Sequence, residues 1–110
     1  MPSPARIRST IATITGPSQD LKQMAVVHKA LADPTRLRIL QRLAEAEGTV
    51  SDLMRHVDLS QPLVSWHVRR LRAAGLIETR RSGRETICSL GRETLVRFRE
   101  QERLLLDLGR

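Results

Sequence analysis

The sequence predicts a small, mainly α-helical fold that carries one β-hairpin. Its 110 residues suit a single domain with one core. Only 2% of the residues are aromatic, so the core has to be built from aliphatic side chains, and the leucines recur at helical spacing. Residues 76–90 break this pattern, because two extended stretches flank Ser82 and Gly83, a pair that suits a tight hairpin turn.

An N-terminal arm and a first helix open the chain. Residues 1–19 are rich in Pro, Ser, Thr and Gly and have no steady period, which predicts a flexible arm before a folded domain over residues 20–110. Asp20 is expected to cap a helix that begins near Leu21. The apolar face predicted for this helix consists of Leu21, Met24, Ala25, His28 and Leu31.

An Asp-Pro pair separates the first helix from the second. The residue before a proline is pushed out of the helical region, and proline itself suits the first turn of a helix. Asp33 is therefore expected to cap a second helix that starts at Pro34 and is ended by Gly48. Its predicted apolar positions are Leu37, Ile39, Leu40, Leu43 and Ala44.

A short helix and a longer helix follow, separated by a turn. The short third helix is predicted at residues 50–57, with Thr49 or Ser51 near its start. Ser60 is expected to cap a fourth helix over residues 61–74, which a glycine then ends. The apolar positions of the third helix are Leu53, Met54 and Val57.

The order of these elements predicts the architecture. A last helix follows the hairpin, and its apolar stripe consists of Leu95, Phe98, Leu105 and Leu108. The order is thus four helices, a hairpin and one helix. A short helix, a tight turn and a longer helix with a polar outer face make a helix-turn-helix, and a basic hairpin directly after it is a wing. The predicted fold class is a winged helix-turn-helix.

Charge and cysteine content narrow the function. The formal net charge of +7 points to an anionic partner, nucleic acid before a membrane surface. No apolar run has the length of a transmembrane helix or a signal peptide, so a cytoplasmic protein is expected. Cys88 is the one cysteine, and a small apolar role is expected for it. No enzymatic activity is expected, since no nucleophile–base pair, carboxylate pair, metal triad or Gly-rich phosphate loop is found.

The fourth helix has two different sides. At about 100° per residue, one broad side is apolar and must pack on the other helices. Its members are Leu63, Val64, His67, Val68 and Leu71. The opposite side carries small and polar residues that permit entry into a DNA major groove, where the N-terminal residues of such a helix meet base edges. The DNA contacts predicted from this helix are Ser60, Gln61, Pro62, Ser65, Trp66 and Arg69.

Several of these residues have predicted roles. Gln61 can pair with an adenine edge, and Ser65 can bond a base or a phosphate. The exposed indole of Trp66 can contact DNA, the wing or a neighbouring subunit. His67 lies toward the core and is expected to be a structural histidine with its hydrogen bonds satisfied.

The predicted wing carries Arg80, Arg81 and Arg84 around Gly83. Three cations at a hairpin tip repel one another unless anions are near, so phosphate contacts are predicted for all three. Such contacts position a protein on DNA without specifying sequence.

Three segments of the chain resemble the ArsR/SmtB family of bacterial winged-helix repressors. They are ALADPTRLRILQRL (30–43), LSQPLVSWHVRRLRAAGLIETRRSGR (59–84) and the Ser-Leu pair at 89–90, and the likeness covers about residues 21–108. The resemblance implies a homodimer that binds a palindromic double-stranded DNA operator and releases it on binding an inducer, commonly a metal ion or metalloid. It places the dimer interface on the first and last helices, at Leu21, Met24, His28, Leu95, Phe98, Leu105 and Leu108.

The metal ligands usual in this family are missing at the matching positions. Thr49 and Ser51 stand where the family has thiolates, and hydroxyls are poor ligands for soft metals. The family's other site matches Arg92, Thr94, Leu105 and Leu108, which are not useful ligands. His28 and His56 are the remaining candidates for a nonstandard nickel or zinc site, with Glu100 or Glu102 as carboxylates.

The predicted function is therefore a sequence-specific DNA-binding transcriptional regulator, a repressor, without the usual metal ligands. One alternative is a regulator that responds to nickel or zinc through a nonstandard site, or that senses its signal through a partner protein. A second alternative is a non-specific nucleic-acid-binding or scaffold winged helix. Sequence-specific binding to duplex DNA separates the first function from the last.

Overall fold

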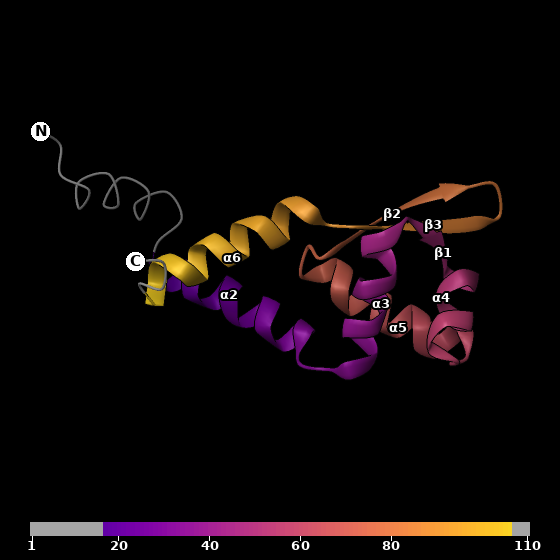
Figure 1. Cartoon of the computed structure of the whole chain (residues 1–110), viewed down its shortest axis with the longest axis horizontal. Coiled ribbons are helices and arrows are strands. Elements are labelled where there is room, and N and C mark those ends of the chain that lie inside the picture. The colour runs from indigo at the N-terminus through magenta and orange to yellow at the C-terminus, as the bar shows by residue number, and fades with distance from the viewer. Residues whose placement is uncertain (1–16, 107–110) are drawn as a thin grey trace, which may run out of the picture.

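The computed structural model describes residues 17–106, with side chains from Asp20 onward. The predicted order of four helices, a hairpin and one helix is confirmed, and a short strand is added before the third of these helices (Figure 1). The elements are α2 (Pro17–Leu31), α3 (Pro34–Glu45), β1 (Gly48–Thr49), α4 (Val50–Val57), α5 (Gln61–Ala73), β2 (Ile77–Ser82), β3 (Glu85–Leu90) and α6 (Arg92–Leu106). Most of the predicted arm and the predicted interface residue Leu108 lie outside the described residues.

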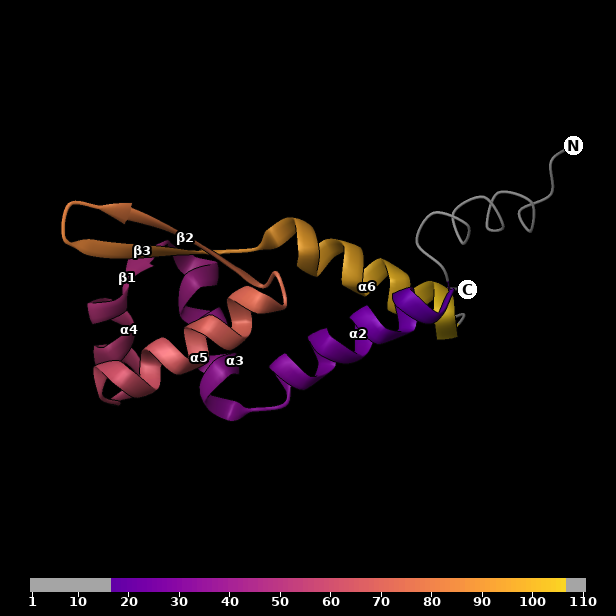
Figure 2. The same cartoon turned by 180° about the vertical axis from the view of Figure 1, so that it is seen from behind.

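The two ends of the molecule differ in kind. At one end α3, α4 and α5 pack beside the small sheet, and the hairpin projects past them (Figures 1 and 2). At the other end α2 and α6 extend away from this unit. The sheet is antiparallel with the order β1-β3-β2, so the second wing strand lies in the middle.

Local chemistry sets the helix starts. Asp33 caps α3 as predicted, because its carboxylate accepts a hydrogen bond from the backbone N–H of Arg36 at 3.0 Å. Thr49 and Asp52 form a capping box at the start of α4, with reciprocal bonds of 3.0 and 2.9 Å. Ser60 stands at the cap position of α5, but its hydroxyl accepts no capping hydrogen bond, so the side-chain cap predicted there is wrong.

Two helix boundaries differ from the prediction. Helix α2 starts at Pro17, so Asp20 lies within its first turn, where its charge suits the positive end of the helix. Helix α3 ends at Glu45, before Gly48. Gly48 is instead paired with Cys88 as part of β1, a long-range contact that local sequence does not reveal.

The hairpin turn is shifted by one residue from the predicted Ser82-Gly83 pair. Ser82 is still paired with Glu85, so Gly83 and Arg84 are the two residues of the turn. Gly83 has a φ of +63°, a conformation that glycine adopts without steric cost. The wing therefore presents Arg84 at its tip.

One mainly aliphatic core joins α2, α3, α4, α5, the base of the hairpin and, through Phe98, α6. Its largest fully buried side chains are Val27, Ile39, Leu43, Leu53, Val64, Leu71, Leu76, Ile77 and Cys88. Gly91 is needed where α6 leaves this core, since a Cβ there would lie 2.2 Å from the carbonyl oxygen of Gly75. Among the described helices, none combines the length and apolar character that a membrane-spanning helix requires.

The predicted apolar face of α2 is largely wrong. Its buried residues are Met24, Val27 and Ala30, with Leu31 partly buried. Three residues predicted on the apolar face are exposed, namely Leu21, Ala25 and His28. Helical spacing fits two neighbouring stripes on this helix, and the packing of α3, α5 and α6 decides which one is covered.

Smaller corrections apply to α3 and α5. The leucines Leu37 and Leu63 were predicted in apolar faces, yet each is 49% exposed, and Ala44 is exposed as well. On α3 the buried stripe instead begins with a charged residue, Arg36, which is 7% exposed. The remaining apolar positions predicted on these two helices are buried.

Candidate nucleic-acid interface

Helix α5 is held at the surface by α3 and α4 and keeps one side uncovered. A tight turn at Asp58, which has a left-handed φ of +55°, ends α4 and leads into α5. The side predicted to face a groove is accessible, since Gln61, Pro62 and Arg69 are exposed and Ser65 is half-buried. The chain thus presents a polar helix face beside a projecting hairpin, the arrangement of a winged helix-turn-helix.

Gln61 and Ser65 form a pair on that face. The amide Nε2 of Gln61 donates to the Ser65 hydroxyl at 3.0 Å. This bond uses one amide hydrogen and leaves the second hydrogen and the carbonyl oxygen available. A donor and an acceptor in that arrangement are what the major-groove edge of adenine requires.

Trp66 lies beside two arginines of the protein itself. The guanidinium carbons of Arg70 and Arg36 lie 5.0 and 5.8 Å from its ring centroid, which permits cation–π attraction. Its ring also meets the ring of His67 edge-on, with centroids 4.9 Å apart. The indole is still 43% exposed.

His67 is buried and hydrogen-bonded, as predicted for a structural histidine. Its Nδ1 lies 3.3 Å from Nη1 of Arg36 and 3.9 Å from a carboxylate oxygen of Asp33. Burial lowers the pKa of His67, and the positive charge of Arg36 lowers it further, although the carboxylate of Asp33 acts in the opposite direction. The imidazole is therefore neutral at pH 7.

The three wing arginines are not equivalent. Arg80 forms a bidentate ion pair with Glu47, with N–O distances of 2.8 and 2.9 Å, so one of the three cations is already paired with a carboxylate of the protein. This hydrogen-bonded pair lowers the pKa of Glu47 and raises that of Arg80. Arg81 donates to the Thr86 hydroxyl at 3.2 Å. At the turn, Arg84 is exposed and makes no hydrogen bond or ion pair with the described residues.

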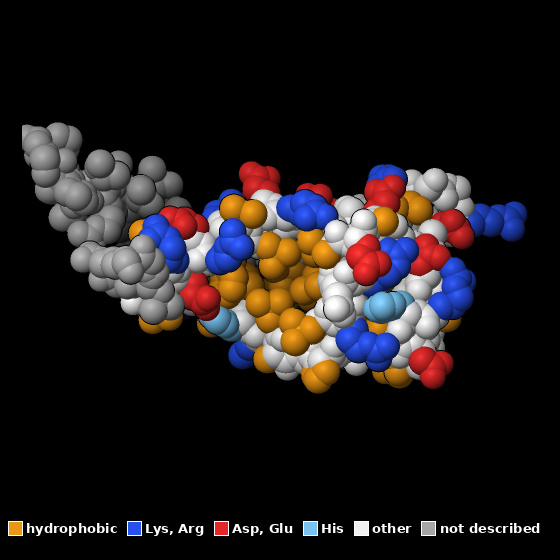
Figure 3. All heavy atoms as spheres, viewed as in Figure 1, with side chains coloured by type: hydrophobic (Ala, Val, Ile, Leu, Met, Phe, Trp, Pro, Cys, Tyr) orange, Lys and Arg blue, Asp and Glu red, His pale blue; other side chains and the backbone are white. Residues whose placement is uncertain are grey.

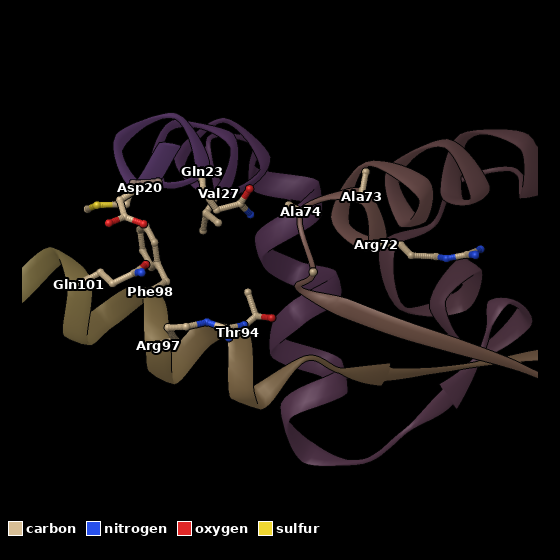
Figure 4. A pocket seen from close by; sticks show the side chains of 12 residues that line it. Asp20, Gln23, Val27, Arg72, Ala73, Ala74, Thr94, Arg97, Phe98 and Gln101 are labelled. Carbon is tan, nitrogen blue, oxygen red and sulfur yellow. The ribbon is translucent and has the colours of Figure 1, made fainter. Parts of the chain in front are cut away.

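The opposite end of the molecule holds an open groove of about 350 Å³ between α2, α6 and the end of α5. Figure 3 shows a hollowed apolar patch between α2 and α6, with charged side chains around it. The groove itself is lined by both apolar and polar side chains. Val27 and Phe98 face each other across it, with Arg97 and Gln101 on the α6 side (Figure 4). Exposed apolar side chains surround this end on α2 and α6, namely Leu21, Val26, Val96, Leu104, Leu105 and Leu106.

The metal candidates are not brought together. His28 bonds Glu102 at 3.0 Å and meets the Phe98 ring edge-on, whereas His56 is exposed on α4. In residues 17–106 no group of three or more His, Cys, Asp or Glu is arranged to hold a metal ion. Cys88 is fully buried in β3, and burial raises the pKa of its thiol.

Sequence reasoning missed two residues of this region. Arg36 had a detectable signal, because it continues the buried stripe of Ile39, Leu40 and Leu43 backward by helical spacing. Glu47 had none, since its partner Arg80 is 33 positions away.

Comparison with known proteins identifies the family. Residues 33–79 match the family model for bacterial regulatory proteins of the arsR family. A probable mercury resistance operon repressor of Streptomyces lividans is 37% identical over 91 residues, which cover 83% of this chain and 72% of that protein. The chain belongs to the ArsR family. An arsenical resistance operon repressor of Staphylococcus xylosus is 36% identical, over 67% of this chain and 71% of that protein.

Solved structures of ArsR regulators share the fold. An ArsR-like transcriptional regulator from Rhodococcus sp. RHA1 has a TM-score of 0.70 and 31% identity, over 79% of this chain and 83% of that chain. A homodimeric winged helix-turn-helix DNA-binding domain from Mycobacterium bovis has a TM-score of 0.66 and 27% identity, over 82% and 84%. This ArsR-family protein is thus a DNA-binding transcriptional regulator with a winged helix-turn-helix fold.

Proposed function

We propose that this ArsR-family protein is a cytoplasmic homodimeric repressor, without enzymatic activity, that binds a palindromic operator. Helix α5 enters the major groove and the wing lies over the flanking phosphates. The observation that carries this proposal is the hydrogen-bonded Gln61–Ser65 pair, which leaves a donor and an acceptor at the exposed start of α5. The formal net charge of +7 supports a polyanionic partner.

The proposed contacts fall into two classes. Gln61 and Ser65 read base edges, and Ser60, Pro62, Trp66 and Arg69 surround them on the same helix. Arg84 contacts phosphate from the turn of the wing, with Arg81 behind it. Arg80 contributes less, because Glu47 already occupies both arms of its guanidinium.

A DNA-selection experiment tests the function. The purified protein is used to select duplexes from a random library, and the selected duplex then competes with a scrambled duplex of the same composition. We expect a two-fold symmetric site whose half-sites lie about 10 bp apart, or a multiple of that, because two recognition helices must meet the same face of the DNA. Equal binding to both duplexes would favour the non-specific nucleic-acid-binding or scaffold alternative.

The proposed dimer uses α2 and α6. Exposed apolar side chains there, such as Leu21 and Leu105, would be covered by a second copy. This interface would be supported by contacts that pack α2 against α6 within one subunit. They are made by Met24, His28, Leu95 and Phe98. Leu105→Glu should therefore give monomers in sedimentation, whereas Leu37→Glu, a leucine of similar exposure on α3, should leave the dimer intact.

The inducer proposed for this protein is not a thiophilic ion. The positions of the usual cysteine ligands hold Thr49 and Ser51, and Thr49 already caps α4. We expect that one equivalent of arsenite or cadmium leaves operator binding unchanged in a gel-shift titration. A response to nickel or zinc that is lost in His28→Gln but kept in His56→Gln would instead support the metal-responsive alternative, built on the His28–Glu102 pair. A response that requires a second purified protein would point to a sensing partner.

A further inference from the structure

Arg36 connects three helices through one buried guanidinium. Its Nε donates to the carbonyl oxygen of Ala30 at 2.7 Å and its Nη2 donates to that of Lys29 at 3.2 Å, both in the last turn of α2. Its Nη1 lies 3.3 Å from Nδ1 of His67 on α5. One side chain of α3 therefore bonds both the proposed dimerisation helix and the proposed recognition helix.

The charge of this buried cation is balanced without a direct ion pair. In the part of the chain that the structure describes, the guanidinium has no carboxylate partner, because Asp33 accepts from the backbone N–H of Arg36 instead. The carbonyl groups at the end of α2 supply negative potential. The face of the Trp66 ring, 5.8 Å away, adds to it.

Hydrogen-bond chemistry fixes the protonation state of His67. A guanidinium can only donate, so Nδ1 of His67 has to accept and cannot carry a proton. The 3.9 Å approach of Asp33 to the same nitrogen is therefore not an ion pair while the Arg36 bond exists. The lowered pKa of His67 agrees with this neutral form.

We propose that the Arg36–His67 hydrogen bond is a positioning contact that sets α5 against α2, and that operator binding depends on it. The proposal rests on the proposed DNA-binding role of α5. Neither residue touches the operator; both act by fixing where the recognition helix stands relative to the dimer interface. In a two-fold dimer, a small rotation of α5 in each subunit changes the spacing between the two recognition helices.

Acidification breaks this contact in a defined way. A proton on Nδ1 removes the acceptor and places a second cation beside Arg36, while Asp33 is close enough to become the new partner. Arg70, on α5 itself, adds a further positive charge near the site, 5.0 Å from the Trp66 ring centroid, and α2 contributes backbone carbonyls. Because the folded pKa lies below the usual 6.5, the contact is present at neutral pH and is lost as the pH falls through that lowered pKa.

The protein contains its own reporter for this event. Trp66 is the single tryptophan of the chain, and its ring centroid lies 4.9 Å from that of His67. An imidazolium quenches indole fluorescence more strongly than a neutral imidazole does. Protonation of His67 is therefore visible without any DNA.

The first measurement is a fluorescence titration from about pH 7.5 to about pH 5, across the range in which histidine titrates. We expect Trp66 emission to fall in the wild type with a midpoint below 6.5. His67→Asn should show no such step, because the amide oxygen can replace Nδ1 as acceptor and does not titrate. The His28→Gln/His56→Gln double variant, which lacks the other two histidines, should keep the step.

The second measurement is operator affinity at about pH 7.5 and about pH 5.5, with the duplex obtained by selection. We expect wild-type affinity to fall about tenfold on acidification, equivalent to about 1.4 kcal/mol, and His67→Asn to keep its affinity. This sign is diagnostic, because added positive charge by itself would tighten binding to a polyanion. Arg36→Lys keeps the charge but loses the planar guanidinium with its several N–H donors, so it should weaken operator binding at both pH values.

The outcomes separate the two proposals. A wild type that binds no duplex preferentially at pH 7.5 refutes the proposed function, and the fluorescence titration then still decides whether His67 titrates as described. Preferential binding that is insensitive to pH, or equally sensitive in His67→Asn, overturns the positioning role. Loss of helical circular dichroism at pH 5.5 together with the fluorescence step also overturns it, since the contact would then only stabilise the fold.

Discussion

The start of α5 and the wing are both exposed and both proposed to meet DNA, yet they are built differently. On α5 two neutral side chains, Gln61 and Ser65, bond each other and hold a fixed pattern of donor and acceptor. On the wing Arg80 is held by Glu47, Arg81 is bonded to Thr86, and Arg84 extends from the turn. The start of α5 is organised for recognising bases. The wing presents three positive charges that differ in how far contacts within the protein already occupy them.

This difference shows that the number of arginines overstates the charge that the wing offers to phosphates. The Arg80–Glu47 pair is exposed on both sides, with side chains 58% and 51% accessible, so its contribution to stability is small. Its geometric effect is larger, because it ties β2 to the loop before β1. The pair orients the wing, and the charge at its tip is left to Arg84.

Removal of Gln61 should give the largest effect on sequence preference. Gln61→Ala is expected to reduce discrimination at one base pair per half-site by roughly 1–3 kcal/mol if the pairing is bidentate. The salt dependence of binding should stay the same, because no charge is lost. Competition between operator and scrambled duplex over a range of salt measures both quantities. Ser65→Ala, which only releases the Gln61 amide, should also reduce discrimination, by a smaller amount. An equal loss of affinity for both duplexes would contradict a base-reading role.

Removal of Arg84 should change salt dependence instead of preference. Each lost phosphate contact lowers the slope of log affinity against log salt by about 0.9, so Arg84→Ala should lower it by about 1.8 in a dimer. Affinity should fall alike for operator and scrambled duplex. Arg103→Ala removes the same charge from α6, where Arg103 is paired with Glu100, and should leave the slope nearly unchanged. A change of sequence preference in Arg84→Ala would reverse the roles of helix and wing.

Release of Arg80 from Glu47 should raise the salt dependence of binding, by less than the loss of Arg84 lowers it. In Glu47→Gln the guanidinium loses its carboxylate partner, so the slope should rise by at most the same amount, about 1.8 per dimer. Binding to the scrambled duplex should tighten more than binding to the operator. The matched control is Glu47→Gln combined with Arg80→Gln, which should lose the gain. An unchanged slope in Glu47→Gln would mean that Arg80 does not reach phosphate even when released.

Treatment with a thiol reagent should have the smallest effect on operator binding. Cys88 is fully buried in the central strand of the wing sheet, and the raised pKa keeps its thiol protonated at neutral pH. Iodoacetamide applied to the native protein should neither modify Cys88, as measured by mass spectrometry, nor alter operator binding. Modification after unfolding in urea serves as the positive control. Rapid native labelling would show that the base of the wing opens.

The sequence determined the features that depend on neighbouring residues. The Asp33 cap, the bounds of α4 at residues 50–57, the hairpin and the exposed polar side of α5 all follow from capping, turn and periodicity rules. These interactions span three or four positions, so the printed sequence contains both partners within one short window. The fold class followed from their order.

Only the tertiary structure decided the contacts between distant segments. The bond between Arg36 and His67 joins residues 31 positions apart, and the Arg80–Glu47 pair joins residues 33 apart. The covered side of α2 was decided in the same way, because its sequence offers two apolar stripes and only packing chooses between them. A side chain's partner depends on which surfaces meet when the chain folds, and periodicity within one helix does not contain that information.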